Sequence, residues 1–292
     1  MKKLSLVLCA FAMLMTLSGC KDARAEITDG SEAIVSVGKE SVTKSDIYEL
    51  LKNGAGQTTI SLIQEQITKL EKISLDADAK AEAKESFDAL KNSFENEKQF
   101  NEAMKSAGYK DEKDYLEKVG YPAQKNIELV KKYIKENEKA VFDKYHPVKA
   151  VVIQTSAKEK ATKALAALKD GEKPTTIAKK YGNAKTFDGK EDVYFINGNV
   201  PGVVFDKMAA ATKQGVIDEV IEDAATQSYY VVKMVNLDPN SYKEEAASAI
   251  AKKSGDIVNE MLTHYLKKYH FTVYDKDIYD QIKRSNANYI TQ

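Results

Sequence analysis

The chain has 292 residues, of which 43% are hydrophobic and 30% are charged, which is enough for two domains with ordinary cores. Lys plus Arg and Asp plus Glu number 44 each, so the formal net charge is zero. A neutral chain has no basic field that would attract nucleic acid, and we expect no nucleic-acid partner.

The first twenty residues are typical of a lipoprotein signal peptide. Lys2 and Lys3 precede an apolar run, Leu4–Leu17, which is too short to span a bilayer. The run leads into Leu-Ser-Gly-Cys at 17–20, where small residues flank the bond to be cleaved and the thiol of Cys20 accepts a diacylglycerol. An ordinary secretory peptide that happens to end in cysteine is the alternative. We predict a signal peptide over 1–19, lipidation of Cys20, and a lipid-anchored protein on the extracytoplasmic face of the cell membrane.

Cysteine and histidine usage excludes several kinds of site. Cys9 lies in the expected signal peptide and Cys20 would carry lipid, so the mature chain offers no thiol nucleophile, disulfide or Cys-ligated metal. His264 and His270 are six residues apart and would face different sides of a helix. We therefore expect no cofactor and no metal. Acidic residues in the middle of the chain lack EF-hand spacing and are interpreted as a solvated loop: Asp188, Glu191 and Asp192.

The first part of the mature chain is predicted to be a tether followed by a helical arm. Residues 20–32 are polar and have no apolar periodicity. The arm, 33–146, begins with a short strand at Ala33–Val37, and Thr43 and Asp46 have the spacing of a capping box that starts a helix. Tyrosines recur along the second half of this arm, where they either line a peptide-binding surface or are ordinary half-buried helix residues: Tyr109, Tyr115, Tyr121, Tyr133 and Tyr145.

A second helical arm is predicted over 237–284, followed by a polar tail at 285–292. Its main helix pattern covers Tyr242–Tyr269, and Asp275 begins a last short helix. Neither arm has an apolar face wide enough to form a domain alone. We expect the two arms to pack together into one helical module; two unrelated helical bundles are the alternative.

The middle of the chain, 147–236, has the pattern of a small α+β domain. It opens on Val148–Ile153 and closes on Tyr229–Val235, both rich in β-branched and aromatic residues, with helix patterns and a Val-Tyr-Phe-Ile strand between them. Strand-rich ends around a helical middle predict that the first and last strands are neighbours in one antiparallel sheet. The predicted fold is therefore α+β, with this domain inserted between the arms and a hinge at His146-Pro147.

Several short motifs of the middle and the C-terminus share their spacing with a known family. They are the helix Ala157–Asp170 ending at Gly171, Ile177–Tyr181, Asn199-Val200-Pro201 leading into the core residue Phe205, Gly215 before Val216–Val220, and the ending Lys268–Ile278. On these residues the middle resembles a parvulin-type prolyl isomerase domain, and the whole chain is similar to the PrsA-type foldase lipoproteins.

The resemblance implies an apolar cup of Met and Phe side chains beside two histidines that hydrogen-bond across the first and last strands. Carried over one at a time, the histidine positions fall on Ala150 and Tyr230. The cup methionine falls on Asn199, and the cup phenylalanine on Val203 or, with a one-residue slip, on Val204. Every one of these positions is substituted, so we predict a parvulin-like fold with a degenerate catalytic site.

The predicted function is a membrane-anchored foldase and chaperone that assists secreted proteins after translocation. Its partners would be unfolded secreted polypeptides and, through the N-terminal lipid, the membrane; a homodimer is left open. The alternative is an active peptidyl-prolyl cis-trans isomerase in which Tyr230 and its neighbours replace the usual groups, so enzymatic activity is left open too. A third alternative, a solute-binding lipoprotein, would require repeated βαβ patterns with parallel strands, and few strands are predicted.

Overall fold

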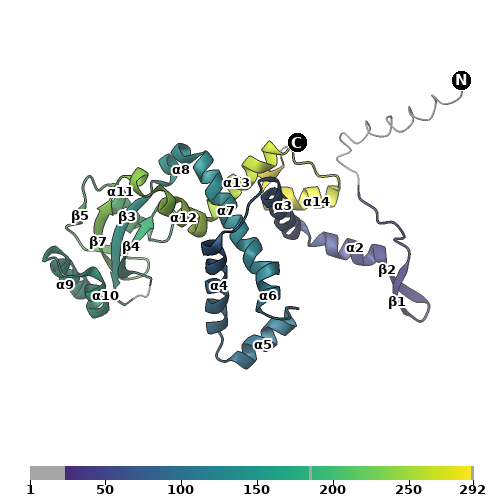
Figure 1. The fold of residues 1–292 in the computed structure, drawn as a ribbon, viewed down its shortest axis with the longest axis horizontal. Helices are drawn as coiled ribbons and strands as arrows, with labels where there is room; N and C mark the ends of the chain where they lie inside the picture. Colours follow the sequence, from purple (N-terminus) through teal and green to yellow (C-terminus); the bar gives the residue numbers. More distant parts are fainter. Residues whose placement is uncertain (1–23, 184–185, 291–292) are drawn as a thin grey trace, which may run out of the picture. The chain divides into compact units, whose positions relative to one another are not determined.

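The computed structural model describes residues 24–183 and 186–290, without the side chain of Gln57. The predicted signal peptide, Cys20 and the start of the tether lie outside these residues. The chain forms two compact units, which are described separately. The described part of the first, 24–72 with 262–290, is called the terminal unit here, and residues 73–261 are called the middle unit (Figure 1).

The helices of the middle unit begin and end at residues with clear capping chemistry. Asp76, Asn96 and Asp111 each accept a hydrogen bond from a backbone N–H in the first helical turn. Pro122 occupies the first turn of its helix, as its fixed φ favours. The elements in this part are α4 (Ala77–Asn92), α5 (Glu97–Ser106), α6 (Glu112–Tyr115), a π-helical turn (Leu116–Gly120), α7 (Tyr121–Glu136), α8 (Glu138–Tyr145) and, after the sheet, α12 (Lys243–Lys253), which packs on α7.

The sheet of the middle unit confirms the prediction that its first and last strands are neighbours. β3 (Val148–Thr155) pairs antiparallel with β7 (Ser228–Asn236), and the strand order is β4-β3-β7-β5, with β6 also pairing with β7. The acidic residues interpreted as a loop lie instead in β4 (Asp188–Tyr194), paired with β3. The other elements are α9 (Lys158–Lys169), α10 (Pro174–Tyr181), α11 (Gly202–Ala209), β5 (Gly215–Val216) and β6 (Ile221–Asp223).

Helices cover both faces of this sheet, which explains why its central strands are continuously apolar. Val151, Ile153 and Val231 point to the face packed by α9 and α10. Val152 and Tyr230 point to the opposite face, packed by α11. Successive side chains of a strand alternate between the two faces, so each strand contributes side chains to the core on both sides of the sheet.

The junction between α8 and the sheet is held by several contacts. His146 ends α8 in the left-handed conformation with φ of 45°. The Ile196 N–H then donates to the Tyr145 carbonyl at 2.9 Å, and the Tyr145 and Phe195 rings meet edge to face at 6.0 Å. Tyr242, which follows the last strand of the sheet in the sequence, donates its hydroxyl to the Pro147 carbonyl at 2.9 Å. These contacts argue against a free hinge at His146-Pro147.

The terminal unit combines segments from both ends of the described chain. The first segment forms a hairpin of β1 (Ala33–Val37) and β2 (Glu40–Thr43), followed by α2 (Lys44–Asn53) and α3 (Gly56–Leu70). The second segment contributes the last turns of α13 (Gly255–Lys268) and the whole of α14 (Lys276–Ser285). The predicted capping box is confirmed: the Thr43 N–H donates to Asp46 Oδ2 at 2.7 Å, and the Asp46 N–H donates to Thr43 Oγ1 at 3.2 Å. α14 packs on α3 and α2.

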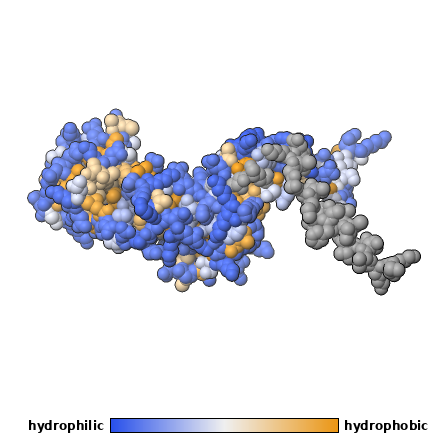
Figure 2. Space-filling model, turned by 90° about the horizontal axis from the view of Figure 1, so that it is seen from above, coloured by the Kyte–Doolittle hydropathy of each residue, from blue (hydrophilic) through white to orange (hydrophobic). Residues whose placement is uncertain are grey.

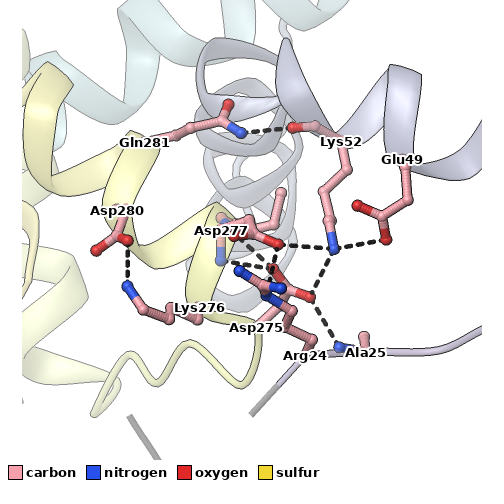
Figure 3. A network of polar contacts seen from close by, with 10 residues as sticks. Arg24, Ala25, Glu49, Lys52, Asp275, Lys276, Asp277, Asp280 and Gln281 are labelled. Carbon is pink, nitrogen blue, oxygen red and sulfur yellow. Dashed lines mark hydrogen bonds and ion pairs between the residues drawn. The ribbon is translucent and has the colours of Figure 1, made fainter. Parts of the chain in front are cut away.

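A buried lysine joins α2 to α14 (Figure 3). Lys52 is only 2% exposed, and its Nζ lies 2.9 Å from Glu49 Oε1, 2.9 Å from Asp277 Oδ2 and 3.5 Å from Asp275 Oδ2. Asp275 also accepts the N–H of Ala25 at 2.8 Å, and it caps α14 through the N–H groups of Asp277 and Ile278. A paired, hydrogen-bonded lysine is the form in which a protein can bury this charge. We call these residues the Lys52 network.

Candidate functional site

The sheet face beneath α11 holds two of the positions that the family resemblance marks as catalytic, Ala150 and Tyr230. Phe187, Phe205, Met208 and Tyr230 are buried together there with aliphatic side chains from β3 and β7. The Tyr230 ring is 2% exposed and meets Phe187 edge to face at 5.6 Å. Burial raises the pKa of the Tyr230 hydroxyl above its usual value. The position expected to hold a catalytic histidine therefore carries an aromatic core residue.

The two expected histidine positions do not face each other. Ala150 lies opposite Met234, whereas Tyr230 lies opposite Gln154. Four residues of strand separate the two positions, or about 13 Å at roughly 3.3 Å per residue. Side chains interact across a sheet when they are directly opposite or diagonal, and the diagonal neighbour of Tyr230 on this face is Val152. The residue directly opposite Tyr230 is Gln154, and its amide donates to Ser228 Oγ at 2.9 Å, so the two carried-over positions do not form the expected pair across the strands.

Asn199 belongs to a polar link and not to an apolar cup. Its Nδ2 donates to Asp192 Oδ2 at 3.3 Å, and the same oxygen accepts Lys253 Nζ at 2.7 Å. Asp192 lies on β4 and Lys253 on α12, so this link ties the sheet to a helix of the arm. Asn199 Oδ1 is buried and has no hydrogen-bond partner among the described residues. Such an orphaned carbonyl destabilises the loop by about 1–3 kcal/mol unless water reaches it.

Val203 and Val204, the two candidates for the cup phenylalanine position, lie on different sides of α11. Val203 is 45% exposed and points away from the sheet, while Val204 is fully buried. Phe205 and Met208 lie on the same buried side of the helix as Val204. The aromatic side chain that α11 contributes to this face is therefore Phe205, which confirms the prediction that it is a core residue.

Polar groups that the sequence reasoning missed surround Tyr230 at the turn before β7. Thr226 Oγ1 donates to Asp223 Oδ2 at 2.7 Å, and Gln154 Nε2 donates to Ser228 Oγ at 2.9 Å. Asp223 and Ser228 are buried, so these bonds satisfy groups that could not otherwise leave water. Asp223 is the last residue of the three-residue strand β6, which is too short for a pattern of alternating residues to show that Asp223 is buried.

A second candidate surface lies on the helices α4 to α6. Phe87, Phe100 and Leu116 form a buried cluster, with Phe94 and Tyr115 packed against it. Beside the cluster is an open cavity of about 620 Å³, which we call the aromatic groove. Its lining residues are Glu97, Lys98, Phe100, Asn101, Glu102, Met104, Lys105, Tyr109, Lys110, Asp111 and Glu112. The recurring tyrosines, among them Tyr109 and Tyr115, were the sequence signal for it.

The described residues hold no group of three or more His, Cys, Asp or Glu side chains placed to bind a metal ion. Within the same residues, none of the helices combines the length and apolar character that crossing a bilayer requires.

The fold is α+β, with a small sheet domain between helical segments, and known proteins are similar to the chain over nearly its whole length. The chain is 24% identical to a foldase protein of the PrsA type from Bacillus cereus over 285 residues, which cover 94% of both chains. It is 28% identical to a foldase protein PrsA from Lacticaseibacillus paracasei over 293 residues, 92% of this chain and 91% of that protein. The resemblance to the PrsA-type foldases thus extends over nearly the whole chain.

Solved structures and family profiles complete the comparison. The crystal structure of the PrsA foldase from Streptococcus pneumoniae aligns with 88% of this chain and 99% of its own, at 22% identity and a TM-score of 0.48. The PrsA structure from Bacillus subtilis aligns over the same share of this chain, with a TM-score of 0.43. No protein-family profile matches the chain.

Proposed function

We propose that the protein is a membrane-anchored extracytoplasmic foldase that acts as a chaperone for secreted polypeptides, with a parvulin-like domain that has lost its catalytic site. The observation that carries the proposal is the similarity to proteins named foldases over 94% of the chain. A chaperone needs a surface of mixed apolar and polar character that binds many sequences weakly. The face of the molecule seen in Figure 2 is mostly hydrophilic with separate hydrophobic areas, which suits that role.

The test is suppression of aggregation by residues 21–292, the mature chain without the cysteine that would carry the lipid; this unlipidated form is used wherever the mature chain is assayed. We expect a stoichiometric amount to lower light scattering of a chemically denatured test enzyme several-fold on dilution from denaturant. Serum albumin at the same mass concentration is the control for crowding. Scattering equal to that with albumin would contradict the chaperone function.

The lipid anchor rests on Leu-Ser-Gly-Cys at 17–20, which lies outside the described residues. Attachment to the membrane concentrates a weak binder where clients emerge, so low intrinsic affinity is offset by high local concentration. Cys20→Ala should abolish lipid labelling and release the protein or leave it as an unprocessed precursor. Unchanged membrane fractionation of that variant would contradict the anchor.

The loss of isomerase activity rests on the buried face beneath α11. Tyr230 is buried against Phe187, Val152 is its diagonal neighbour, and Gln154 directly opposite donates its amide to Ser228, so the expected histidine pair is replaced by groups already engaged in the core. The alternative, an active prolyl isomerase, would need the Tyr230 hydroxyl. The other alternative, a solute-binding lipoprotein, is disfavoured because every strand pairing is antiparallel within the described residues.

For the domain organisation we propose one helical module formed by the arms 33–146 and 237–284, with the parvulin-like domain 147–236 inserted between them. Packing of α12 on α7, and of α14 on α2 and α3, supports this arrangement. Ion pairs add to it: Lys252 Nζ lies 2.9 Å from Glu82, and Lys243 Nζ lies 2.6 Å from Glu138.

A homodimer is proposed through the terminal unit. The large hydrophobic side chains that are exposed among the described residues belong to this unit, Val203 excepted: Ile34, Val35, Val37, Val42, Leu50, Leu51, Leu62, Leu70 and Tyr274. A two-stranded hairpin is marginal in water, and a second copy would cover the apolar β1–β2 hairpin. Sedimentation velocity of the unlipidated mature chain should show a dimer that Ile34→Asp with Val37→Asp dissociates. A monomer at 100 µM would contradict the dimer.

A further inference from the structure

The aromatic groove has a hydrophobic floor built by aromatic rings in edge-to-face contact. Phe100, on α5, is 4% exposed and meets both Phe87 and Phe94 edge to face, at 5.5 Å each. Tyr109, also in the lining, meets the Tyr115 ring edge to face at 5.2 Å. Edge-to-face contacts of this kind fix the orientation of the rings. The floor is therefore preformed, and a bound side chain would not have to order it.

The mouth of the groove combines one fixed and one adaptable side chain. Tyr109 follows α5, and its N–H donates to the Met104 carbonyl at 3.0 Å, which fixes the backbone where the tyrosine begins. Gly108 just before it has φ of +82°, the left-handed conformation that ends the helix. Met104 is half-buried, and its unbranched thioether adapts to apolar groups of different shape. The volume of about 620 Å³ accommodates a large side chain with adjoining backbone.

The ion pairs at the rim of the groove leave two of its lysines outside any described ion pair. Glu97 is paired with Lys91 at 3.0 Å, and Glu112 is paired with Lys84 at 2.8 Å. Asp111 accepts the Asp114 N–H at 2.8 Å as the cap of α6. Lys98 and Glu102, also in the lining, pair with each other at 3.9 Å. The other two lysines of the lining, Lys105 and Lys110, are exposed and lie within 4 Å of no carboxylate in the described ion pairs; the charge of Lys110 acts on Asp114, which is itself paired with Lys118 at 2.8 Å. An acidic group beside the groove would complement Lys105 and Lys110.

We propose that the aromatic groove binds a large aromatic side chain of an unfolded polypeptide, with a preference for segments that carry acidic residues next to it. The inference rests on the proposed chaperone function and names the site and the class of segment that it captures. The aromatic rings of the floor supply the apolar contact, and Lys105 and Lys110 favour acidic residues in the bound segment. Binding at one such site is weak, as is suitable for release of a folding client.

The chain contains no tryptophan, so a tryptophan in a peptide reports binding by fluorescence without background. The probes are ten-residue Gly/Ser peptides with one central Trp, flanked on both sides by Asp, by Lys or by Ser, titrated with the mature chain. We expect the Asp-flanked peptide to bind at least threefold tighter than the Lys-flanked one at low salt, with the Ser-flanked peptide between them. Equal affinities for the three peptides, or no binding, would overturn the inference.

Two variants locate the binding at the groove. Lys105→Glu with Lys110→Glu should reverse the order of the Asp- and Lys-flanked peptides. A matched control, Lys160→Glu with Lys163→Glu on the exposed side of α9, makes the same change in net charge and should keep the wild-type order. Met104→Ser should weaken all three peptides at least fivefold while the circular dichroism spectrum is unchanged. Equal effects of the groove and α9 pairs would overturn the inference.

The aggregation assay separates this inference from the proposed function. If the wild-type chain suppresses aggregation and the groove variants bind the peptides as the wild type does, the groove is not the site, and the chaperone function stands. If the wild-type chain does not suppress aggregation, the proposed function fails whatever the peptides show.

Discussion

The sheet of the middle unit and the terminal unit stabilise themselves in opposite ways. The sheet buries apolar side chains on both faces, against α9 and α10 on one side and α11 on the other. The terminal unit buries the charge of Lys52 among carboxylates and leaves large apolar side chains such as Val37, which is 77% exposed, in contact with water. The sheet is complete as it stands, whereas the terminal unit has surface that a partner would cover.

This difference bears on function. A catalytic cup needs an accessible cavity with polar groups at its edge, but the sheet face beneath α11 is filled by Phe205, Met208 and Tyr230. The accessible apolar surface lies elsewhere, on the terminal unit and in the aromatic groove. Association with other chains is therefore better supported than chemistry on the sheet.

The largest expected effect comes from Tyr230→Ala, which opens a cavity in the filled face. Removing a buried aromatic side chain costs about 3–5 kcal/mol of the free energy of unfolding, because the surrounding core relaxes only in part. Urea unfolding followed by circular dichroism would measure the loss. Val203→Ala, at the exposed position of α11, is the control and should change stability by less than about 0.5 kcal/mol. Equal small losses in the two variants would show that the face is not a packed core.

Lys52→Ala should have the next largest effect, confined to the terminal unit. It leaves the buried carboxylate of Asp275 without its cation, which costs about 3 kcal/mol when a buried pair is broken. Hydrogen exchange should show loss of protection in α2 and α14 while the β3 and β7 amides stay protected. Lys139→Ala, in an exposed pair with Asp143, is the control and should cost well under about 1 kcal/mol. Uniform loss of protection across both units would contradict two separately stabilised regions.

A smaller effect is expected from pH. Burial opposes ionisation of Asp275, but hydrogen bonds from the N–H groups of Ile278 and Ala25 and the charge of Lys52 outweigh it, so its pKa is lowered. A carboxyl with a lowered pKa stabilises the fold above its unfolded pKa, about 3.9, and loses this contribution as pH falls through the folded value. The protection factors of the α14 amides, which are exchange rates divided into the intrinsic rate at the same pH, should therefore fall below about pH 4. Asp275→Asn should remove this pH dependence; the same loss of protection in that variant would assign it to another group.

Local features of the fold were predictable from the sequence because few residues determine them. The Thr43/Asp46 capping box and the pairing of the first and last strands follow from spacing and β-branched runs, and both are confirmed. Strand register was not predictable. A shift of two residues along Val148–Ile153 keeps every apolar side chain on the same face, so nothing in the run distinguishes Ala150 from Val152 as the neighbour of Tyr230.

Burial of single polar residues was also beyond the sequence. Lys52 sits among other charged residues of α2, and only the return of the chain at Asp275 and Asp277 encloses it. Asp188, Glu191 and Asp192 were interpreted as a solvated loop because their spacing does not fit an EF-hand. They lie in β4, where pairing with β3 overrides the low strand preference of acidic residues. Contacts between residues far apart in the sequence decide both cases, and in the Lys52–Asp275 pair the separation is 223 positions.

The most direct test of the central claim, a foldase that works without isomerase chemistry, is proline-limited refolding in the presence of the full mature chain. The substrate is a small unfolded protein whose slow refolding phase reflects prolyl isomerisation, which takes tens of seconds uncatalysed. We predict that the wild-type chain and Tyr230→Phe leave this rate unchanged within about twofold, while both suppress aggregation equally. A tenfold acceleration by the wild type, equivalent to about 1.4 kcal/mol in the barrier, that is lost in Tyr230→Phe would contradict the claim and establish an active isomerase.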